Sequence, residues 1–386
     1  MSKVQQIGEV LEPFSSARIP IKAADRVPGE IPYLGASGVV DYVEGFTHNG
    51  CYLCVAEDGA NLLTRSLPIA WIQEGKFWAN NHLHVLGGVS KSRLKYFQYA
   101  IELSNVASFV TGSAQPKLNQ ASLMRIEVPA FGLTTEEAIG AVLGSLDDKI
   151  AANSNAIEKA LLLQSAVWIE GTKGVGSVLL GNVSEPILGG TPPRKDEASW
   201  GGGYKWASVA DMTASPRSHL LNTAETITSL AIEKRRFAPL PAGSVLLSAR
   251  GTVGRVVSLV EPSSFNQSAY GFKVTPGFEA AFRLAVTSAV DELRAKSYGS
   301  VFSTITKTQI NEASVPAVFE TADLPLHHQL NSIESLIVAL EKENVTLAKT
   351  RDELLPLLMN GKISVREAKQ EATSAGADIP SEEIGA

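Results

Sequence analysis

The stretch LGSLDDKIAANSNAIEKALLLQSAV, residues 143–167, places apolar side chains at alternating spacings of three and four residues. That alternation has the period of the a and d positions of a coiled coil. The stripe consists of Leu143, Leu146, Ile150, Asn153, Ile157, Ala160, Gln164 and Val167. The pattern therefore predicts a long helix that packs along one stripe.

A second stretch repeats this spacing 187 residues further along the chain. Its stripe consists of Leu330, Ile333, Ile337, Leu340, Asn344, Leu347, Arg351 and Leu354. Either stripe would also suit a helix packed on its own globular neighbour. Polar members of both stripes, such as Gln164 and Arg351, favour a helix pair, because they weaken an apolar core but specify register. We predict that the two helices pair as an antiparallel coiled coil.

The segments before the two helices are also related to each other, at an offset of 173 residues near their start and 187 near their end, so the second copy carries insertions. IGEVLEP (residues 7–13) matches LGNVSEP (residues 180–186), and GSAQPKLNQASLMRIEVP (residues 112–129) matches GSVFSTITKTQINEASVP (residues 299–316). Two anchors in the same order indicate a duplication. Strand-like runs around glycine turns indicate that both segments are β-rich. The predicted fold class is α+β, with two β-rich domains, each followed by a long helix, in a pseudo-twofold repeat.

Composition narrows the class of protein. The 386 residues are 44% hydrophobic and include two cysteines, which excludes a disordered chain and a disulfide-built scaffold. No apolar run approaches the roughly 20 residues of a membrane span, and the start MSKVQQIGEV has no signal-peptide pattern, so we expect a cytoplasmic protein without a membrane partner. The net charge of −6 argues against a polybasic nucleic-acid binder. However, residues 301–386 carry −6 and residues 175–300 carry +3.

Motifs for catalysis are weak. Cys51 and Cys54 form a C-x-x-C, and His82 and His84 follow, so a zinc enzyme is one hypothesis. A single C-x-x-C in an apolar run is more typical of buried cysteines. We find no phosphate-binding loop, nucleophile elbow or metalloprotease motif. We therefore expect no metal, no catalytic residue and no cofactor bound by this chain.

Candidate nucleic-acid contacts are better represented. Arginine and lysine suit phosphates and guanine edges, while asparagine and glutamine suit adenine edges. In the second copy we single out Arg194, Lys195, Lys205, Lys234, Arg235, Arg236, Arg250, Asn266 and Gln267. In the first copy the set is sparser, and consists of Lys76, Asn80, Asn81, Lys91 and Arg93. Lys117 and Lys307 belong to the repeated segment and are candidate phosphate contacts.

These motifs resemble the specificity (S) subunit of type I restriction-modification systems. In the second copy the family's order is seen in VSEPILGGTPPRKD (residues 183–196), YKWASVADM (204–212), LPAGSVLLSARGTVGRV (240–256) and FNQSAYGFKV (265–274). The first copy shows IPYLGASGVVDYVEG (31–45) and FWANNHLHVL (77–86), but it lacks the GGTP and S-A-R-G motifs. The resemblance covers nearly all of residues 5–366.

The resemblance implies a division of the chain and a function. Residues 1–130 and 175–318 would be target recognition domains, residues 131–174 and 319–362 conserved helices, and residues 363–386 a disordered acidic tail. Each recognition domain would read one half of a bipartite, asymmetric site in double-stranded DNA. The helices would set the spacing and bind two methyltransferase (M) subunits. S-adenosylmethionine, ATP and magnesium would be held by the M subunits and the restriction (R) subunits. The alternative is a scaffold that binds no DNA, with two β-rich modules on a coiled coil.

Overall fold

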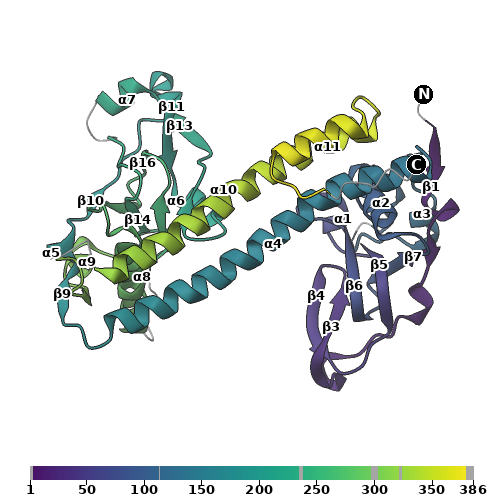
Figure 1. Ribbon diagram of the computed structural model, residues 1–386, viewed down its shortest axis with the longest axis horizontal. Helices are drawn as coiled ribbons and strands as arrows, with labels where there is room; N and C mark the ends of the chain where they lie inside the picture. The colour runs from purple at the N-terminus through teal and green to yellow at the C-terminus, as the bar shows by residue number, and fades with distance from the viewer. Residues whose placement is uncertain (1–2, 113, 234–237, 297–302, 321–323, 380–386) are drawn as a thin grey trace. The chain divides into compact units, whose positions relative to one another are not determined.

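A computed structural model describes residues 3–112, 114–233, 238–296, 303–320 and 324–379. The chain divides into two compact units. Unit 1 consists of Met1–Ala152 and Glu343–Ala386, and unit 2 consists of Asn153–Lys342. We call residues 1–130 the first head and residues 175–318 the second head. Each unit is described by itself below (Figure 1).

The first head is built on a six-stranded sheet with the strand order β2-β7-β5-β6-β3-β4. All neighbours are antiparallel except β3 and β6. The strands of unit 1 are β1 (Val4–Gln6), β2 (Glu12–Pro13), β3 (Pro28–Gly35), β4 (Gly38–Val43), β5 (His48–Ala56), β6 (Ala70–Ala79), β7 (Leu83–Gly87) and β8 (Glu127–Pro129). Its shorter helices are η1 (Ile7–Glu9), η2 (Ser15–Ala17), η3 (Ala23–Asp25), α1 (Asn61–Thr64), α2 (Lys91–Leu103), η4 (Val106–Phe109) and α3 (Gln120–Met124).

Helix α2 packs between this sheet and the long helix α4 (Leu133–Thr172). Ser90 caps α2 by accepting a hydrogen bond from the Arg93 amide, and the helix buries Tyr96 and Phe97 in the core. On the other side of the contact, Gly140 of α4 approaches the α2 backbone so closely that an added Cβ would lie 1.8 Å from the Ser92 carbonyl oxygen. The contact therefore requires glycine at that position.

The first part of α4 pairs with the last part of α10 (Pro325–Met359) inside unit 1. Asp147 Oδ1 accepts a hydrogen bond from Arg351 Nη1 at 2.7 Å, and Lys149 Nζ lies 3.9 Å from Glu343 Oε1. The partner number falls as the α4 number rises, so the pairing is antiparallel. Leu143, Leu146, Leu347 and Leu354 are buried, and the other stripe members of this unit, Ile150, Asn344 and Arg351, are half-buried.

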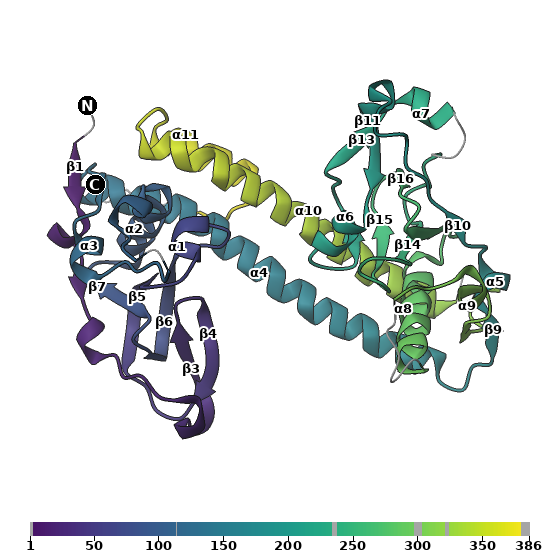
Figure 2. The ribbon, with the colours of Figure 1, turned by 180° about the vertical axis from the view of Figure 1, so that it is seen from behind.

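The second head contains a five-stranded sheet with the order β10-β17-β14-β15-β12, a three-stranded sheet with the order β13-β11-β16, and the two-stranded sheet β18-β9. Its strands are β9 (Ser177–Leu179), β10 (Ile187–Leu188), β11 (Trp200–Ala207), β12 (His219–Leu220), β13 (Glu225–Ile227), β14 (Val245–Ser248), β15 (Val256–Leu259), β16 (Ser263–Phe265), β17 (Ala269–Phe272) and β18 (Ser314–Pro316). Its helices are α5 (Leu180–Val183), η5 (Glu197–Ser199), α6 (Val209–Ala214), α7 (Ser229–Glu233), α8 (Glu279–Lys296) and α9 (Lys307–Asn311). Helix α8 packs on β14 and β15 (Figure 2).

The helices also pair inside unit 2. Ile157, Ala160 and Ile337 form one cluster, with Ile333 and Leu340 packed against it. Gln164 Nε2 donates to Glu334 Oε2 at 2.8 Å, and a Cβ on Gly171 would touch Leu326, so the direction is again antiparallel. Leu330 and Asn153 are buried. The predicted α+β class with two antiparallel long helices is confirmed.

The duplication extends to single contacts. Helices α3 and α9, and strands β8 and β18, are each separated by 187 residues, and Asn119 and Thr306 cap the two short helices in the same way. The same offset relates the acceptor Asp147 to the acceptor Glu334. It also relates their donors on the opposite long helix, Arg351 and Gln164. The contacts of Arg351 with Asp147 and of Gln164 with Glu334 therefore occupy equivalent positions in the two halves of the repeat.

The prediction of a disordered tail is wrong for its first part. Helix α11 (Val365–Ser374) begins at a capping box in which Ser364 and Glu367 exchange hydrogen bonds. Ala368, Ala372 and Ala377 are buried in the core of unit 1. Alanine is the best helix former, so this small-residue segment forms a helix. Its alanines provide the apolar stripe that packs in the core of unit 1. Residues 380–386 lie outside the described part. No described helix is long and apolar enough to cross a membrane.

Candidate nucleic-acid interface

Three loops of the second head are joined by backbone hydrogen bonds. The amides of Ala249 and Arg250 donate to the Ser268 carbonyl at 2.8 and 3.1 Å, which ties the turn after β14 to the turn before β17. The amide of Gly190 donates to the Phe265 carbonyl at 2.8 Å, which ties residues 189–192 to the same turn. We call residues 189–192, 249–251 and 266–268 the loop cluster. It unites the GGTP, S-A-R-G and N-Q-S motifs, which are far apart in the sequence.

The loop cluster presents polar side chains to solvent, above all Arg250 and Gln267. Arg250 is exposed, and no ion pair to it is found among the residues that the structure describes. Gln267 is exposed and its Oε1 accepts a hydrogen bond from the Thr191 hydroxyl. Asn266 is half-buried, and its Oδ1 accepts from the Ser268 amide at 3.1 Å, which shapes the turn. The Arg250 guanidinium and the exposed Gln267 amide are therefore carried by loops that are hydrogen-bonded to one another.

The turn that carries Arg250 is held by contacts with α8 and with Ser248. Gly254 has a φ of +83°, and a Cβ there would lie 2.8 Å from Val290 of α8. The Gly254 amide donates to the Ser248 carbonyl at 2.8 Å, and the Arg255 amide donates to the Ser248 hydroxyl at 2.8 Å. The glycine turn expected from the sequence therefore has a packing reason as well as a conformational one.

Arg194 lies beside the loop cluster but is already paired. Its guanidinium stacks 4.2 Å from the Trp200 ring centroid and 5.3 Å from that of Trp206. Nη1 and Nη2 both donate to the Glu225 carboxylate, at 2.5 and 3.0 Å. The hydrogen bonds that Arg194 donates to Glu225 raise the pKa of Arg194, so the guanidinium stays charged. Trp206 Nε1 donates to the Gly190 carbonyl at 2.9 Å and links this stack to the loop cluster.

The other candidates of the second head lie apart from the loop cluster or outside the described residues. Lys205 Nζ donates to the Leu221 carbonyl and pairs with Glu261 at 3.0 Å. Lys307 pairs with Glu185 at 2.9 Å. Lys195 is exposed in the loop after Arg194. Lys234, Arg235 and Arg236 lie outside the described residues.

Candidates of the first head divide into exposed and structural side chains. Lys76 is exposed on β6 and lies 5.0 Å from the Phe46 ring centroid, and Asn81 is exposed in the next turn. Asn80 is buried, and its Oδ1 accepts from the His82 amide. Lys91 pairs with Glu74 at 2.6 Å. Arg93 Nε donates to the fully buried Glu136 carboxylate, which fixes α2 on α4.

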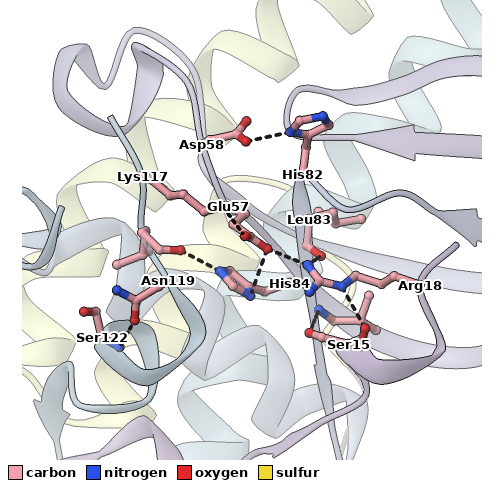
Figure 3. A network of polar contacts seen from close by, with 12 residues as sticks. Ser15, Arg18, Glu57, Asp58, His82, Leu83, His84, Lys117, Asn119 and Ser122 are labelled. Carbon is pink, nitrogen blue, oxygen red and sulfur yellow. Dashed lines mark hydrogen bonds and ion pairs between the residues drawn. The ribbon is translucent and has the colours of Figure 1, made fainter. Parts of the chain in front are cut away.

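Lys117 belongs to a polar network around Glu57 (Figure 3). Arg18 and Lys117 pair with Glu57 at 2.5 and 3.1 Å, and His84 Nε2 lies 2.7 Å from the Leu118 carbonyl. Burial alone would raise the pKa of Glu57, but the bonds from Arg18 and Lys117 outweigh it and hold the pKa below its usual value. Burial lowers the pKa of His84. The network fastens the repeated segment 112–129 to the sheet, which gives Lys117 a structural role.

The zinc hypothesis finds no support in the described residues. Within them, no group of three or more histidine, cysteine, aspartate or glutamate side chains is arranged to hold a metal ion. Cys54 is fully buried in β5, and burial raises the pKa of its thiol. His82 instead lies 2.6 Å from Asp58, and His84 faces Leu118.

The sequence search missed several residues of the interface. Thr191 binds Gln267, and the Ser268 carbonyl accepts from two amides of the arginine turn. Trp200 and Glu225 hold Arg194. Thr191 was visible as part of the quoted GGTP motif, but no sequence signal pairs Glu225 with Arg194. They meet because β13 places Glu225 opposite Trp206 of β11, and the Arg194 guanidinium lies over the Trp206 ring.

Comparisons with known proteins give a consistent result. The model of the family described as type I restriction modification DNA specificity domain matches residues 1–162 and 173–318. A Haemophilus influenzae protein that bears the name of a type I restriction enzyme specificity subunit is 29% identical over 272 residues, 68% of this chain and 69% of that protein. The MjaIX specificity subunit of Methanocaldococcus jannaschii is 25% identical over 45% of this chain and 41% of its own length. The S subunit structure from M. genitalium superposes with a TM-score of 0.69 at 12% identity, covering 93% of this chain and 96% of that one.

Proposed function

Because this chain belongs to the type I restriction-modification DNA specificity family, which contributes sequence recognition rather than catalysis, we propose that its two heads are target recognition domains for a bipartite DNA site. Residues 1–130 would read one half-site and residues 175–318 the other. The two heads differ in sheet order and in exposed side chains, so the two half-sites would differ in sequence. The site of action would be the cytoplasm, where the DNA is.

The loop cluster is the observation that carries this proposal. Arg250 and Gln267 stand exposed on loops whose backbones are hydrogen-bonded to one another. Arginine binds guanine O6 and N7 through two donors, and glutamine binds adenine N6 and N7, so this pair matches base edges in the major groove. Rigid support matters because a base contact discriminates only when its geometry is fixed. Lys195, Lys76 and Asn81 are the other exposed candidates for which the described residues provide no ion pair.

The long helices would separate the half-sites and bind partner subunits. Helix α4 has 40 residues and so is about 60 Å long, more than one DNA turn of about 34 Å. Its outer face in unit 2 exposes 72% of Leu162, 55% of Leu163 and 68% of Ile169. Contiguous exposed apolar side chains mark an interaction surface, and we assign this one to an M subunit. Two M subunits would carry S-adenosylmethionine, and R subunits would use ATP and magnesium.

Methylome sequencing of a strain that expresses the system tests the proposal as a whole. The expected result is adenine methylation at one asymmetric, two-part sequence, which would be lost when this gene is deleted. Methylation that does not depend on this gene, or a complex with M subunits that never binds specific DNA, would favour the scaffold alternative.

Arg250→Ala is expected to weaken specific binding by the complex with M subunits by about 1–3 kcal/mol, or roughly 5- to 150-fold, because one bidentate base contact is lost. Discrimination should relax at one position of one half-site and stay unchanged in the other. Competition binding with single-base variants of the target measures both effects.

Lys296→Ala is the matched control for Arg250→Ala. Lys296 is also an exposed cation of the second head, but it pairs with Glu292 within α8. We expect this variant to bind and discriminate like the unaltered chain. Equal losses in both variants would mean that charge alone, and not a base contact, explains the effect.

Leu162→Glu combined with Ile169→Glu is expected to reduce M-subunit association at least tenfold, because two carboxylates would be desolvated in the interface. Size-exclusion chromatography with the purified M subunit measures the stoichiometry. Leu103→Glu is the control, since Leu103 is 48% exposed at the end of α2, outside this face. Assembly of the double variant that equals the control would contradict the assignment.

A further inference from the structure

A buried polar cluster joins the second head to α10 within unit 2. His219 of the edge strand β12 is 3% exposed and lies between two carboxylates of α10. Its Nδ1 lies 2.8 Å from Glu341 Oε2, and its Nε2 lies 2.9 Å from Glu334 Oε1. The second approach is too oblique for an aligned hydrogen bond and is an ion contact.

This arrangement suits only a protonated ring. A neutral imidazole carries one N–H, so one of its nitrogens would present a lone pair to a carboxylate. Burial alone would lower the pKa of His219, but Glu334 and Glu341 outweigh it and raise the pKa above its usual value. Arg283 of α8 and Gln164 of α4 complete the surroundings, both hydrogen-bonded to Glu334. With the ring protonated, two cations face two carboxylates.

The His219 contact is coupled to the loop cluster through neighbouring strands. Strand β12 has two residues and pairs only with β15 in its sheet, so its backbone holds it weakly. The Ser215 hydroxyl donates to the His219 carbonyl at 2.8 Å, and Arg255 Nη2 donates to the Ser215 carbonyl at 2.7 Å. The Arg255 amide in turn bonds Ser248 at the base of the arginine turn. A shift of His219 would therefore reach Arg250.

The described residues of the first head form no equivalent contact. Its three histidines, His48, His82 and His84, make contacts inside the head, to Phe14, Asp58 and Leu118. Among the described residues, the side chains that join α2 to α4 include Arg93 with Glu136, Tyr99 with Asp147 and Lys95 with Asp148, and no histidine takes part. The two heads thus differ in how their attachment to the helices responds to pH.

We propose that His219 is a positioning residue for the second recognition domain, and that its two carboxylate contacts fix the loop cluster for reading one half-site. This inference rests on the proposed function. The contact of protonated His219 with its two carboxylates is fully formed below pH about 6.5, the ordinary pKa of histidine. It is lost as the pH rises through the higher pKa that His219 has in the folded chain. Discrimination in the second half-site should therefore fall as the pH rises above about 6.5, while discrimination in the first half-site stays constant.

The test uses the complex with M subunits and competition binding against targets with one altered base in either half. Discrimination in the second half-site is expected to fall about tenfold for each unit by which the docked and released pKa values of His219 differ. His219→Gln should show the low value at every pH, with no remaining pH dependence. His328→Gln is the matched control, because His328 is exposed on α10, the helix that carries Glu334 and Glu341.

Three outcomes would overturn the inference. They are an unchanged pH profile in His219→Gln, an equal pH effect on both half-sites, and a flat profile in the unaltered complex. Glu341→Gln provides a second variant, which keeps the His219 imidazole but removes one carboxylate beside it. It should shift the pH dependence of discrimination in the second half-site to lower pH. The ring proton is followed independently in the full chain by the nitrogen NMR signal of His219. A titrating His219 signal in a complex that binds no specific DNA would contradict the proposed function, whereas specific binding with the wrong pH profile contradicts this inference alone.

Discussion

Arg283→Met is expected to lower the free energy of unfolding of unit 2 by about 3–5 kcal/mol at pH 7. Arg283 is 3% exposed, and its Nε and Nη2 donate to both oxygens of Glu334 at 2.9 and 2.6 Å. Nη2 also donates to Gln164 Oε1 at 2.6 Å, so one guanidinium joins α8 to both long helices. Without Arg283, the buried carboxylates Glu334 and Glu341 share His219 as a cationic partner, so one buried charge is left uncompensated, which explains the size of the loss.

The loss should depend on pH in a defined direction. Burial alone would raise the pKa of Glu334, but His219 and Arg283 outweigh it and hold the pKa far below its usual value. A carboxylate with a lowered pKa contributes stability above its unfolded pKa, near 4.5, and loses it as the pH falls further. The difference between Arg283→Met and the unaltered chain should therefore narrow below pH about 4.5.

Urea unfolding followed by circular dichroism at several pH values measures this difference. Arg294→Met is the matched control, since Arg294 lies on the same helix with a side chain that is 46% exposed, paired with Asp291. An exposed pair contributes about 0–1 kcal/mol, so this control should change little. Equal losses in the two variants would contradict the assigned role of the buried cluster.

Gly140→Ala is expected to destabilise unit 1 by about 1–3 kcal/mol, although alanine normally stabilises a helix. The new Cβ would lie 1.8 Å from the Ser92 carbonyl oxygen and 2.9 Å from the Tyr96 amide nitrogen. Both atoms belong to the α2 backbone and cannot move like a flexible side chain. The two helices would have to separate, and the core around Tyr96 would open.

Gly144→Ala is the control one turn further along α4. Its Cβ would meet only the Lys95 side chain, at 3.6 Å, which is ordinary van der Waals contact. This variant should be neutral or more stable by about 0.5–1 kcal/mol, because alanine has the higher helix propensity. Thermal unfolding of both variants measures the difference. A Gly140→Ala chain as stable as Gly144→Ala would show that α2 and α4 are not in close contact.

Residue type was enough to predict those candidate DNA contacts that are exposed in the loop cluster. It was not enough where the side chain pairs with a carboxylate elsewhere in the chain. Arg250 and Gln267 were named from the sequence and are exposed in the loop cluster. Arg93 and Lys117 were named on the same grounds, but each pairs with a carboxylate that is distant in sequence. Composition does not reveal such pairs, because an arginine or lysine is the same letter in the sequence whether its side chain faces solvent or binds a carboxylate such as Glu136.

The sequence by itself determined the long helices and the duplication. Both are repeats of local pattern, and a spacing of three and four residues or an offset of 187 requires no knowledge of the fold. The start of α11 was also available, as the capping box of Ser364 and Glu367. Tertiary structure alone decided what the polar residues of the seam bind. Gln164, His219, Arg283 and Glu334 come from four separate elements, and each buried charge is stable only because the other elements bring its partners within hydrogen-bonding distance.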